Sequence, residues 1–403
     1  MNRDRRDNII RIVFIAAFAV FLAGASLFTC SPERLARTYS FFENRSLAPR
    51  PERTAQAVLD GTYFSGLEKY LSDHAAGRTT LVQLQTKLDL ALGRPVINEV
   101  VVRDDILLPW NEFAPVNEER IAGAAEQESD NLLSVQELVA SYGGSYCYVM
   151  IPCQYVYYAD RYPSYLNNRS EYTELSMRYL RNALEKKEIS FLDMGEIFDR
   201  LGHPDQFSST VDNHYSIYGA YVTYQSILEY FNSNAGKAPL QILPQDEFTY
   251  EELDLPYLGS RVRKLLNTRT LDEHLFYLSL NHPIPFTRTN NGNPADASVY
   301  AFPPDTDEWV GYGLYMGGDI ANTVIDTGRE ELPSVLVYGD SFTNAVECIM
   351  YWSFDEMHSL DLRYYSGELS FKEYIETYQP DYVVCIRDYE AVLAANGNGM
   401  GVN

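Results

Sequence analysis

Short apolar runs alternate with longer segments of helical periodicity along much of this 403-residue chain. Runs of roughly four to eight apolar residues are typical of strands buried on both faces of a parallel sheet, and apolar residues three and four positions apart are typical of helices packed on it. The expected strands span residues 145–151, 189–192, 335–338, 357–362 and 382–386, and the expected helices span 117–142, 171–187 and 216–231. This alternation predicts an α/β fold, with a mostly parallel sheet and helices on both faces.

Four other regions have a different pattern. Residues 31–50 have the composition of an exposed stalk, residues 53–93 show helical periodicity, and residues 97–109 are typical of a strand pair. Residues 235–334 are rich in Pro, Asn, Gly and Thr without clear periodicity, and we interpret them as an insertion over the sheet with small strands of its own. We therefore divide the chain into a targeting segment (1–30), a stalk with a helical region (31–96) and a main domain (97–403) that contains the insertion 235–334.

The first 30 residues have the pattern of a targeting segment. Arginines precede an apolar stretch from Ile12 to Thr29, as the positive-inside rule requires when the remainder of a chain is translocated. About 20 apolar residues cross a bilayer, and this stretch is close to that length. We expect an N-terminal membrane-anchor helix, single-pass, with the globular part extracytoplasmic. Ala23-Gly24-Ala25 leaves open a cleaved signal peptide and a secreted protein.

The overall charge excludes some classes of partner. The formal net charge is −24 at pH 7, so nucleic acid, anionic polymers and anionic membrane surfaces would be repelled. Apolar residues make up 46% of the chain, which is ordinary for a globular protein with a real core. No cluster of cysteines and histidines has zinc-ligand spacing, and we expect neither a metal nor another cofactor.

The cysteines leave their redox state open. Cys147 and Cys153 lie at the two ends of one expected strand, about 20 Å apart when extended, which is too far for a disulfide. Cys348 and Cys385 remain possible partners for them or for each other. Buried free thiols are the alternative, because free cysteine is among the most buried residue types.

The candidate nucleophile is Ser341, in a Gly-Asp-Ser-Phe segment directly after the expected strand at 335–338. A serine at this end of a parallel strand lies at the sheet edge where ligands bind in α/β proteins. A backbone N–H of Ser341 and of a neighbour can form an oxyanion hole there. Asn344, one helical turn later, is a candidate side-chain donor for the same purpose.

The candidate acid–base pair lies upstream, in an Asp-Asn-His segment. Residues i and i+2 of an extended segment point to the same side, so Asp212 and His214 can face one cleft. Histidine can take the serine proton, and aspartate can hold the imidazole in the required tautomer. Ser341, His214 and Asp212 together indicate a serine hydrolase or acyltransferase. Each motif alone is weak, and a histidine satisfied in the core or at a helix cap is the alternative for His214.

One arginine is a further candidate for substrate contact. Arg387 follows the last expected strand and therefore emerges at the same sheet edge. It can bind a sugar carboxylate or an acyl oxygen. An ordinary ion pair with Asp388 or Glu390 is the alternative.

Several short motifs occur in an order that resembles one known family. They are Glu43-Asn44-Arg45-x-Leu47, Tyr70–His74 with Arg78, Ile97-Asn98, Val211–Tyr215, Asp340–Phe342 and Asp361–Tyr365. On these motifs, over most of its length, the chain resembles the DHHW protein family, relatives of the AlgX/AlgJ-like alginate O-acetylation proteins with an SGNH hydrolase-like fold.

The resemblance carries over to the site residue by residue. Asp212 and His214 match the aspartate and the second histidine of the family's Asp-His-His-Trp pattern, and Ser341 matches the serine of its Asp-Ser element. Asn213 and Tyr215 stand where the family has His and Trp. These changes bear on the packing and on the sugar-binding surface, where Tyr215 is a candidate. Because the base precedes the nucleophile in the chain, the resemblance implies a circularly permuted SGNH hydrolase-like fold.

The function that the resemblance implies is an O-acyltransferase, with acetyl as the acyl group, that acts on a cell-surface polysaccharide. It also implies a membrane-bound O-acyltransferase as the partner that supplies the acyl group. The same three residues would serve a carbohydrate O-acetyl esterase, and a non-catalytic glycan-binding or assembly protein of the same fold is a further alternative. We expect the insertion 235–334 to cover the cleft, with Tyr315–Asp319 nearest to it.

Overall fold

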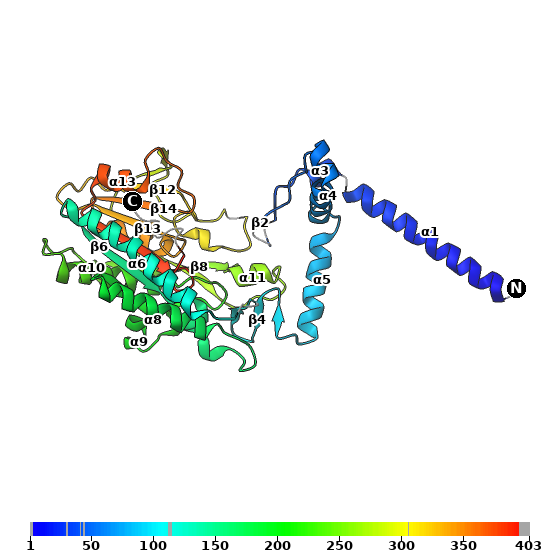
Figure 1. The fold of residues 1–403 in the computed structure, drawn as a ribbon, viewed down its shortest axis with the longest axis horizontal. Coiled ribbons are helices and arrows are strands. Elements are labelled where there is room, and N and C mark those ends of the chain that lie inside the picture. The colour runs from blue at the N-terminus through cyan, green and yellow to red at the C-terminus, as the bar shows by residue number, and fades with distance from the viewer. Residues whose placement is uncertain are drawn as a thin grey trace. The chain divides into compact units, whose positions relative to one another are not determined.

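The computed structural model describes residues 3–29, 31–40, 42, 45–111, 115–304 and 306–394 (Figure 1). The chain forms two compact units. The first comprises Met1–Val100 with Val262–Thr270, and the second comprises Val101–Arg261 with Leu271–Asn403. Cys30 and the Glu43-Asn44 pair of the first motif lie outside the described residues.

The first unit is mainly helical. Its elements are α1 (Arg3–Thr29), α2 (Pro32–Leu35), β1 (Tyr39–Ser40), β2 (Arg45–Ser46), α3 (Ala55–Leu59), α4 (Thr62–Asp73), α5 (Arg78–Ala91) and β3 (Val96–Ile97). The helical region predicted at 53–93 is divided into three helices, because Gly61 (φ 85°) and Gly77 (φ 74°) adopt left-handed backbone conformations that interrupt it. Arg45 pairs with Asp73 through two hydrogen bonds, of 2.8 and 2.6 Å. The motif at Arg45 therefore contacts the motif Tyr70–His74.

The targeting segment forms the long helix α1, drawn in dark blue in Figure 1. Apolar side chains between Ile9 and Leu22 are exposed along it. In the described part of the chain, no helix combines enough length with enough apolar character to cross a membrane. Membrane anchoring of the chain stays a prediction.

The second unit is built on an eight-stranded sheet with the order β11-β10-β12-β14-β13-β15-β6-β7. These strands are β6 (Ser145–Ile151), β7 (Phe191–Asp193), β10 (Thr287–Asn290), β11 (Asn293–Ala295), β12 (Asn322–Asp326), β13 (Val335–Gly339), β14 (Glu356–Asp361) and β15 (Tyr382–Asp388). The run from β14 to β7 is parallel, and β12, β10 and β11 continue it in antiparallel pairing. The carboxyl ends of the parallel strands meet at one edge.

Helices cover both faces of this sheet. They are α6 (Glu118–Ser141), α7 (Gln154–Tyr157), α8 (Ser170–Lys186), α9 (Met194–Arg200), α10 (Ile217–Asn234), α12 (Asn344–Met350) and α13 (Phe371–Tyr378). Phe231 of α10 packs on Tyr382 of β15, whereas Phe371 of α13 packs on Tyr338 of β13. Tyr338 lies beside Cys385 in the ladder, three residues beyond Tyr382, so the two helices lie on opposite faces. The predicted mixed α/β fold with a mostly parallel central sheet is confirmed.

The region 235–334 contributes strands to the central sheet, which a simple insertion over the sheet would not do. Its strands β10, β11 and β12 join the central sheet, while β8 (Phe248–Pro256) and β9 (His274–Leu280) form a separate antiparallel pair. A short helix, α11 (Ser260–Lys264), lies between these two strands in sequence. Upstream, β4 (Val100–Val102) and β5 (Leu107–Pro109) flank the turn expected in the segment 97–109.

The structure shows the redox state of four cysteines. Cys147, Cys153, Cys348 and Cys385 are all buried free thiols. Burial raises the pKa of each thiol, so all four stay protonated at neutral pH. The alternative of disulfides among them does not apply, and these cysteines act as core residues.

Candidate active site

The serine lies in a tight turn at the carboxyl end of β13. Gly339 ends the strand where a side chain would not fit, because a Cβ there would lie 2.1 Å from the carbonyl oxygen of Ile386. Asp340 then closes the turn: its Oδ1 accepts the N–H of Phe342 at 2.9 Å, and its carbonyl accepts the N–H of Thr343 at 2.9 Å. Helix α12 starts at Asn344. The turn thus presents Ser341 at the sheet edge.

The histidine and the aspartate lie just before helix α10. Ser216 caps this helix by accepting the N–H of Gly219, which fixes the direction in which the preceding residues approach it. His214 donates its backbone N–H to Asp212 Oδ1 at 3.1 Å, and the imidazole Nδ1 lies 2.5 Å from the same oxygen. The local turn therefore joins the two side chains, as the i, i+2 spacing predicts.

The two segments meet, although 127 residues separate them in sequence. His214 Nε2 lies 2.7 Å from Ser341 Oγ, within hydrogen-bond reach for direct proton transfer. Since Asp212 accepts at Nδ1, the hydroxyl of Ser341 donates to Nε2. The three residues proposed from sequence form one continuous hydrogen-bonded chain.

The carboxylate of Asp212 is held ionised by its surroundings. Burial acts to raise its pKa, but the charge and hydrogen bond of His214 and the backbone N–H groups of Ser260 and His214 outweigh burial and lower it well below its usual range. The N–H of Ser260, at the start of α11, lies 2.5 Å from Asp212 Oδ2. Both carboxylate oxygens therefore have donors, and Asp212 is fixed as an acceptor for the imidazole.

Tyr312 is a site residue that the sequence did not indicate. Its ring stacks on the imidazole of His214, with centroids 3.6 Å apart and planes 3° apart. Its hydroxyl donates to the carbonyl of Ser341 at 3.2 Å. One tyrosine from the predicted insertion therefore touches both the histidine and the serine, but nothing in its Gly-Tyr-Gly setting distinguishes it from the other tyrosines of the chain.

The expected oxyanion donors differ in their availability. The backbone N–H of Ser341 has no acceptor among the described residues, so it is free to bind an oxyanion. Asn344 is buried, and its amide donates to Asp319 Oδ1 at 3.3 Å. Asp319 is also paired with Arg363 at 3.1 Å. Asp319 of the segment 315–319 thus contacts the start of α12, whereas Tyr312, outside that segment, contacts His214 and Ser341 directly.

Arg387 and Tyr215 support the serine turn from within the protein. The guanidinium of Arg387 is 2% exposed, and its NH1 lies 3.2 Å from Asp340 Oδ2. Its charge therefore faces Asp340, the residue before the serine, whereas the sequence favoured Asp388 or Glu390. Tyr215 is buried, and its hydroxyl donates to the carbonyl of Phe342 at 2.8 Å. These contacts are with protein groups, and a role in substrate binding stays a prediction for both.

No group of acidic residues, histidines and cysteines in the described ranges is arranged to hold a metal ion. The chemistry available at this site is that of the serine hydroxyl, the imidazole and the carboxylate. A cavity of about 320 Å³ lies beside it, lined by residues that include Tyr215 and Tyr312.

Comparisons with solved structures show that the fold of this chain is a known one. No family model matches the sequence, and no curated protein is similar to it in sequence. PatB1 of Bacillus cereus, solved with a sulfonyl adduct, matches with a TM-score of 0.59 and 17% identity over 73% of this chain and 97% of PatB1. A DHHW family protein from Eubacterium siraeum matches with a TM-score of 0.55 and 17% identity over 75% of this chain and 95% of that protein. The O-acetyltransferase domain of Pseudomonas putida AlgJ matches with a TM-score of 0.47 and 14% identity over 74% of this chain and 93% of that domain.

The similar structures thus include a DHHW family protein, the family that the sequence motifs resemble. The predicted relationship is confirmed at the level of the fold. At these identities the likeness shows a shared α/β architecture, and what this chain does must be argued from its own residues.

Proposed function

We propose that this chain is an extracytoplasmic O-acyltransferase that transfers an acetyl group to a hydroxyl of a cell-surface polysaccharide. The observation that carries the proposal is the hydrogen-bonded chain from Ser341 Oγ through the imidazole of His214 to Asp212. This arrangement is the one that turns a serine hydroxyl into a nucleophile. The choice of acetyl as the acyl group follows from the family resemblance of the sequence motifs.

In the first half-reaction, Ser341 Oγ attacks the carbonyl carbon of the acyl donor while His214 Nε2 takes the hydroxyl proton. The resulting oxyanion is stabilised by the free N–H of Ser341. The bond to the leaving group then breaks, and the leaving group takes the proton from His214. The products are an acyl-serine, a neutral imidazole and the released alcohol or thiol. Asp212 stays ionised throughout and stabilises the imidazolium.

In the second half-reaction, a glycan hydroxyl takes the acyl group. His214 Nε2 accepts the proton of that hydroxyl as its oxygen attacks the acyl-serine, and then returns the proton to Ser341 Oγ. Water in place of the glycan would make the same residues an O-acetyl esterase. The choice of transferase over esterase follows from the family resemblance.

Three further parts of the proposal rest on the N-terminal sequence and on the family resemblance. The first is a membrane-bound O-acyltransferase partner that supplies the acyl group. The second is anchoring of the chain at the cytoplasmic membrane through its N-terminal segment, with secretion after cleavage as the alternative. The third is a circular permutation of the SGNH hydrolase-like fold, since the base precedes the nucleophile in the sequence.

The proposal is tested with a serine-directed probe and a transfer assay. A sulfonyl fluoride is suitable because PatB1, whose fold is similar, was solved with a sulfonyl adduct. We expect the purified protein to be labelled at Ser341 and the Ser341→Ala variant to remain unlabelled. With an acetyl ester and oligosaccharides, mass spectrometry should detect acetylated sugar from the wild type alone. Equal glycan acetylation in cells that carry Ser341→Ala would show that the chain is a non-catalytic binding or assembly protein.

A further inference from the structure

The cavity beside the catalytic candidates is a separate compartment. Its volume is about 320 Å³, within the range of small-molecule pockets. Neither Ser341 nor His214 lines it. Its walls come from the start of α10, the start of β9, the segment 205–210 and the short helix at Tyr312–Leu314. It is therefore a potential binding site whose occupant would lie next to the reacting groups.

Aromatic rings dominate the walls of this cavity. Tyr218, Phe276 and Tyr312 are each only partly buried and so can offer a ring surface to a ligand. Tyr218 is held in place by stacking on Tyr250, with centroids 4.2 Å apart, and by edge contact with Phe276 at 5.4 Å. Rigid aromatic surfaces of this kind bind the C–H face of a sugar ring, because they remove apolar surface from water at little entropic cost.

The charge of the cavity limits which sugars it can take. Asp205, Asp272 and Glu273 line it together with His274, whose pKa is raised by a hydrogen bond with the carbonyl of Leu253, and none of its lining residues within the described ranges is a lysine or an arginine. Glu273 accepts hydrogen bonds from Ser209 Oγ at 2.6 Å and from the N–H of Thr210 at 2.9 Å, and burial raises its pKa. The side chain of Asp272 is fully exposed, with His274 Nε2 at 3.5 Å. A sugar carboxylate would meet like charge here, so uronate residues are disfavoured.

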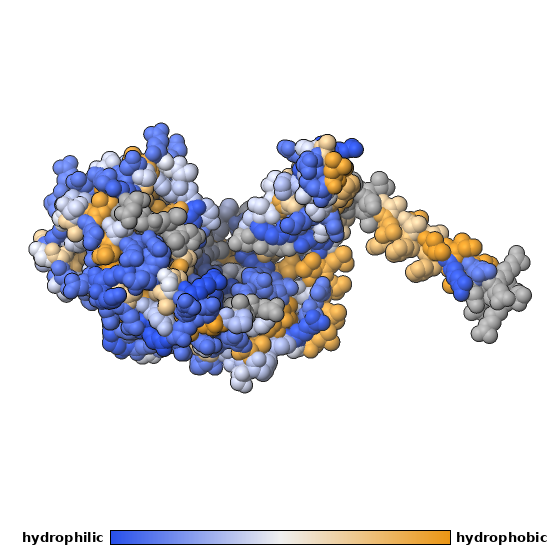
Figure 2. Space-filling view, in the orientation of Figure 1, coloured by the Kyte–Doolittle hydropathy of each residue, from blue (hydrophilic) through white to orange (hydrophobic). Residues whose placement is uncertain are grey.

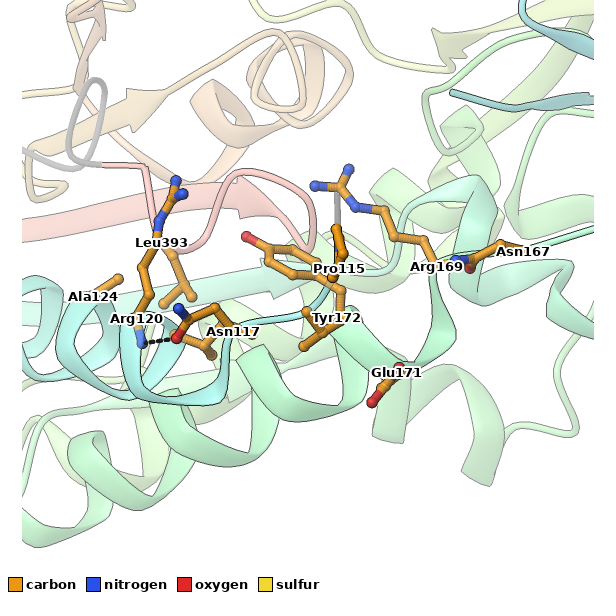
Figure 3. A pocket seen from close by; sticks show the side chains of 11 residues that line it. Pro115, Asn117, Arg120, Ala124, Asn167, Arg169, Glu171, Tyr172 and Leu393 are labelled. Carbon is orange, nitrogen blue, oxygen red and sulfur yellow. Dashed lines mark hydrogen bonds between the residues drawn. The ribbon is translucent and has the colours of Figure 1, made fainter. Parts of the chain in front are cut away.

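Another pocket on the same unit has the opposite character. The pocket in Figure 3, of about 300 Å³, is lined by two arginines, Arg120 and Arg169, and by Tyr172. Arg169 also pairs with Glu390 at 2.6 Å, so part of its charge is already neutralised. None of Ser341, His214 and Asp212 lines this pocket. It offers a control, because it combines an aromatic ring with two arginines and a single acidic residue, Glu171.

Tyr312 connects the aromatic cavity to the proposed chemistry. It lines the cavity, stacks on His214 and donates to the carbonyl of Ser341. A sugar ring resting against Tyr312 would therefore have neighbouring hydroxyls, or the next residue of its chain, within reach of the base. The position suits the acceptor of the second half-reaction.

We propose that this cavity, named here the Tyr218 pocket, binds a sugar residue of the acceptor glycan that carries no carboxylate. The role of this sugar as the acyl acceptor rests on the proposed function. Sugar binding itself can be measured without catalysis. This pocket narrows the substrate class to neutral or amino sugars and excludes polyuronates as the preferred acceptor.

The test measures binding to the Ser341→Ala variant, which cannot be acylated at this position. Chito-oligosaccharides and β-glucan oligosaccharides are titrated calorimetrically and compared with oligouronates of equal length. We expect at least one non-acidic series to bind and the oligouronates to bind at least tenfold more weakly. Adding Tyr218→Ala or Phe276→Ala should weaken the non-acidic series at least fivefold. Adding Tyr172→Ala, in the pocket of Figure 3, should leave it unchanged.

The outcomes separate the two proposals. Absence of binding by both non-acidic series, equal binding of oligouronates, or binding insensitive to Tyr218→Ala and Phe276→Ala overturns the Tyr218 pocket. Thermal unfolding of each variant identifies a loss of folding, and Tyr218→Phe, which keeps the ring, should retain affinity. If the sulfonyl fluoride labels Ser341 while no sugar binds, only the pocket is wrong. If sugars bind but Ser341 is never labelled, sugar binding in the Tyr218 pocket is confirmed and the catalytic proposal is wrong.

Discussion

The ring of Tyr312 lies flat on the imidazole of His214, 3.6 Å from it between centroids and 3° from parallel. The imidazole is thereby restrained between a stacked ring on one face and the carboxylate of Asp212 at Nδ1. A base held in this way keeps Nε2 directed at Ser341 without losing conformational entropy in each turnover.

Replacing the stacked ring should lower the turnover number. Tyr312→Ala removes the ring and should reduce kcat for acyl transfer roughly three- to tenfold, the equivalent of one aromatic contact. Tyr312→Phe keeps the ring, loses only the hydrogen bond to the Ser341 carbonyl, and should retain most of the activity. Steady-state kinetics of both variants with one acetyl ester provides the comparison. Equal rates for Tyr312→Ala and wild type would show that the stacking has no role in positioning the base.

The second prediction concerns the backbone N–H of Ser260, which donates a hydrogen bond to Oδ2 of Asp212. Ser260→Pro removes this donor at the first position of a helix, where proline fits. A charge-assisted hydrogen bond contributes about 1.5–3 kcal/mol, so kcat should fall roughly ten- to hundredfold. Ser260→Ala is the matched control: it keeps the N–H and loses only the contact of the hydroxyl with Asn213. Similar losses in the two variants would contradict a role for the backbone donor.

The third prediction concerns the buried charge behind the serine turn. Arg387→Met leaves Asp340 buried without its cation, which should destabilise the fold by about 3–5 kcal/mol. Arg178→Met breaks an ion pair with Glu118 whose side chains are 57% and 56% exposed, and should cost less than about 1 kcal/mol. Urea unfolding of the three proteins measures the difference. A loss for Arg387→Met no larger than that for Arg178→Met would show that Asp340 is stabilised by other groups.

The fourth prediction is a pH dependence of stability caused by Glu347. This residue lies in α12, and burial raises the pKa of its carboxyl to about 7. Between its ordinary value of 4.5 and about 7, the folded state binds the proton and the unfolded state does not. Stability therefore falls as pH rises through that window, by about 3 kcal/mol in all.

Glu347→Gln should remove this part of the pH dependence, because an amide stays neutral at every pH. Relative to wild type, the variant should gain stability between pH 5 and pH 8, measured as the difference in free energy of unfolding at each pH. Glu376→Gln, at an exposed position of α13, is the control and should show no such change. A constant difference between Glu347→Gln and wild type across this range would contradict a raised pKa.

Most of the parallel sheet is predictable because its strands are continuous apolar runs. The expected strand at 145–151 coincides with β6, and the run at 335–338 forms β13 with one residue added. The Asp212–His214 contact is also predictable, since it depends only on local spacing. The meeting of His214 with Ser341 required the further assumption that both segments reach the same sheet edge.

The rest depends on pairing over long sequence separations. The strands β10 and β11 are short and polar and β12 has only two apolar residues, so their apolar signal is weak, and pairing across the sheet stabilises them. The leucines of α5 follow helical spacing, yet Leu81, Leu84 and Leu88 are about 60% exposed, so the pattern predicts the helix but not what packs on it. Tyr312 has no local signal at all, because its role comes from stacking on a residue far away in the sequence.

The position of β13 in the sheet has a consequence for the synthesis of this protein. The strand that carries the candidate nucleophile is paired with β14 on one side and β15 on the other, and both follow it in the chain. During translation the edge of β13 that pairs with β15 stays open, and β6 and β7 stay separated from β10–β14, until β15 emerges. A prematurely terminated chain would therefore lack activity and would also expose apolar strand edges that promote aggregation. Because of this strand order, we expect cellular quality control to remove truncated products of this chain.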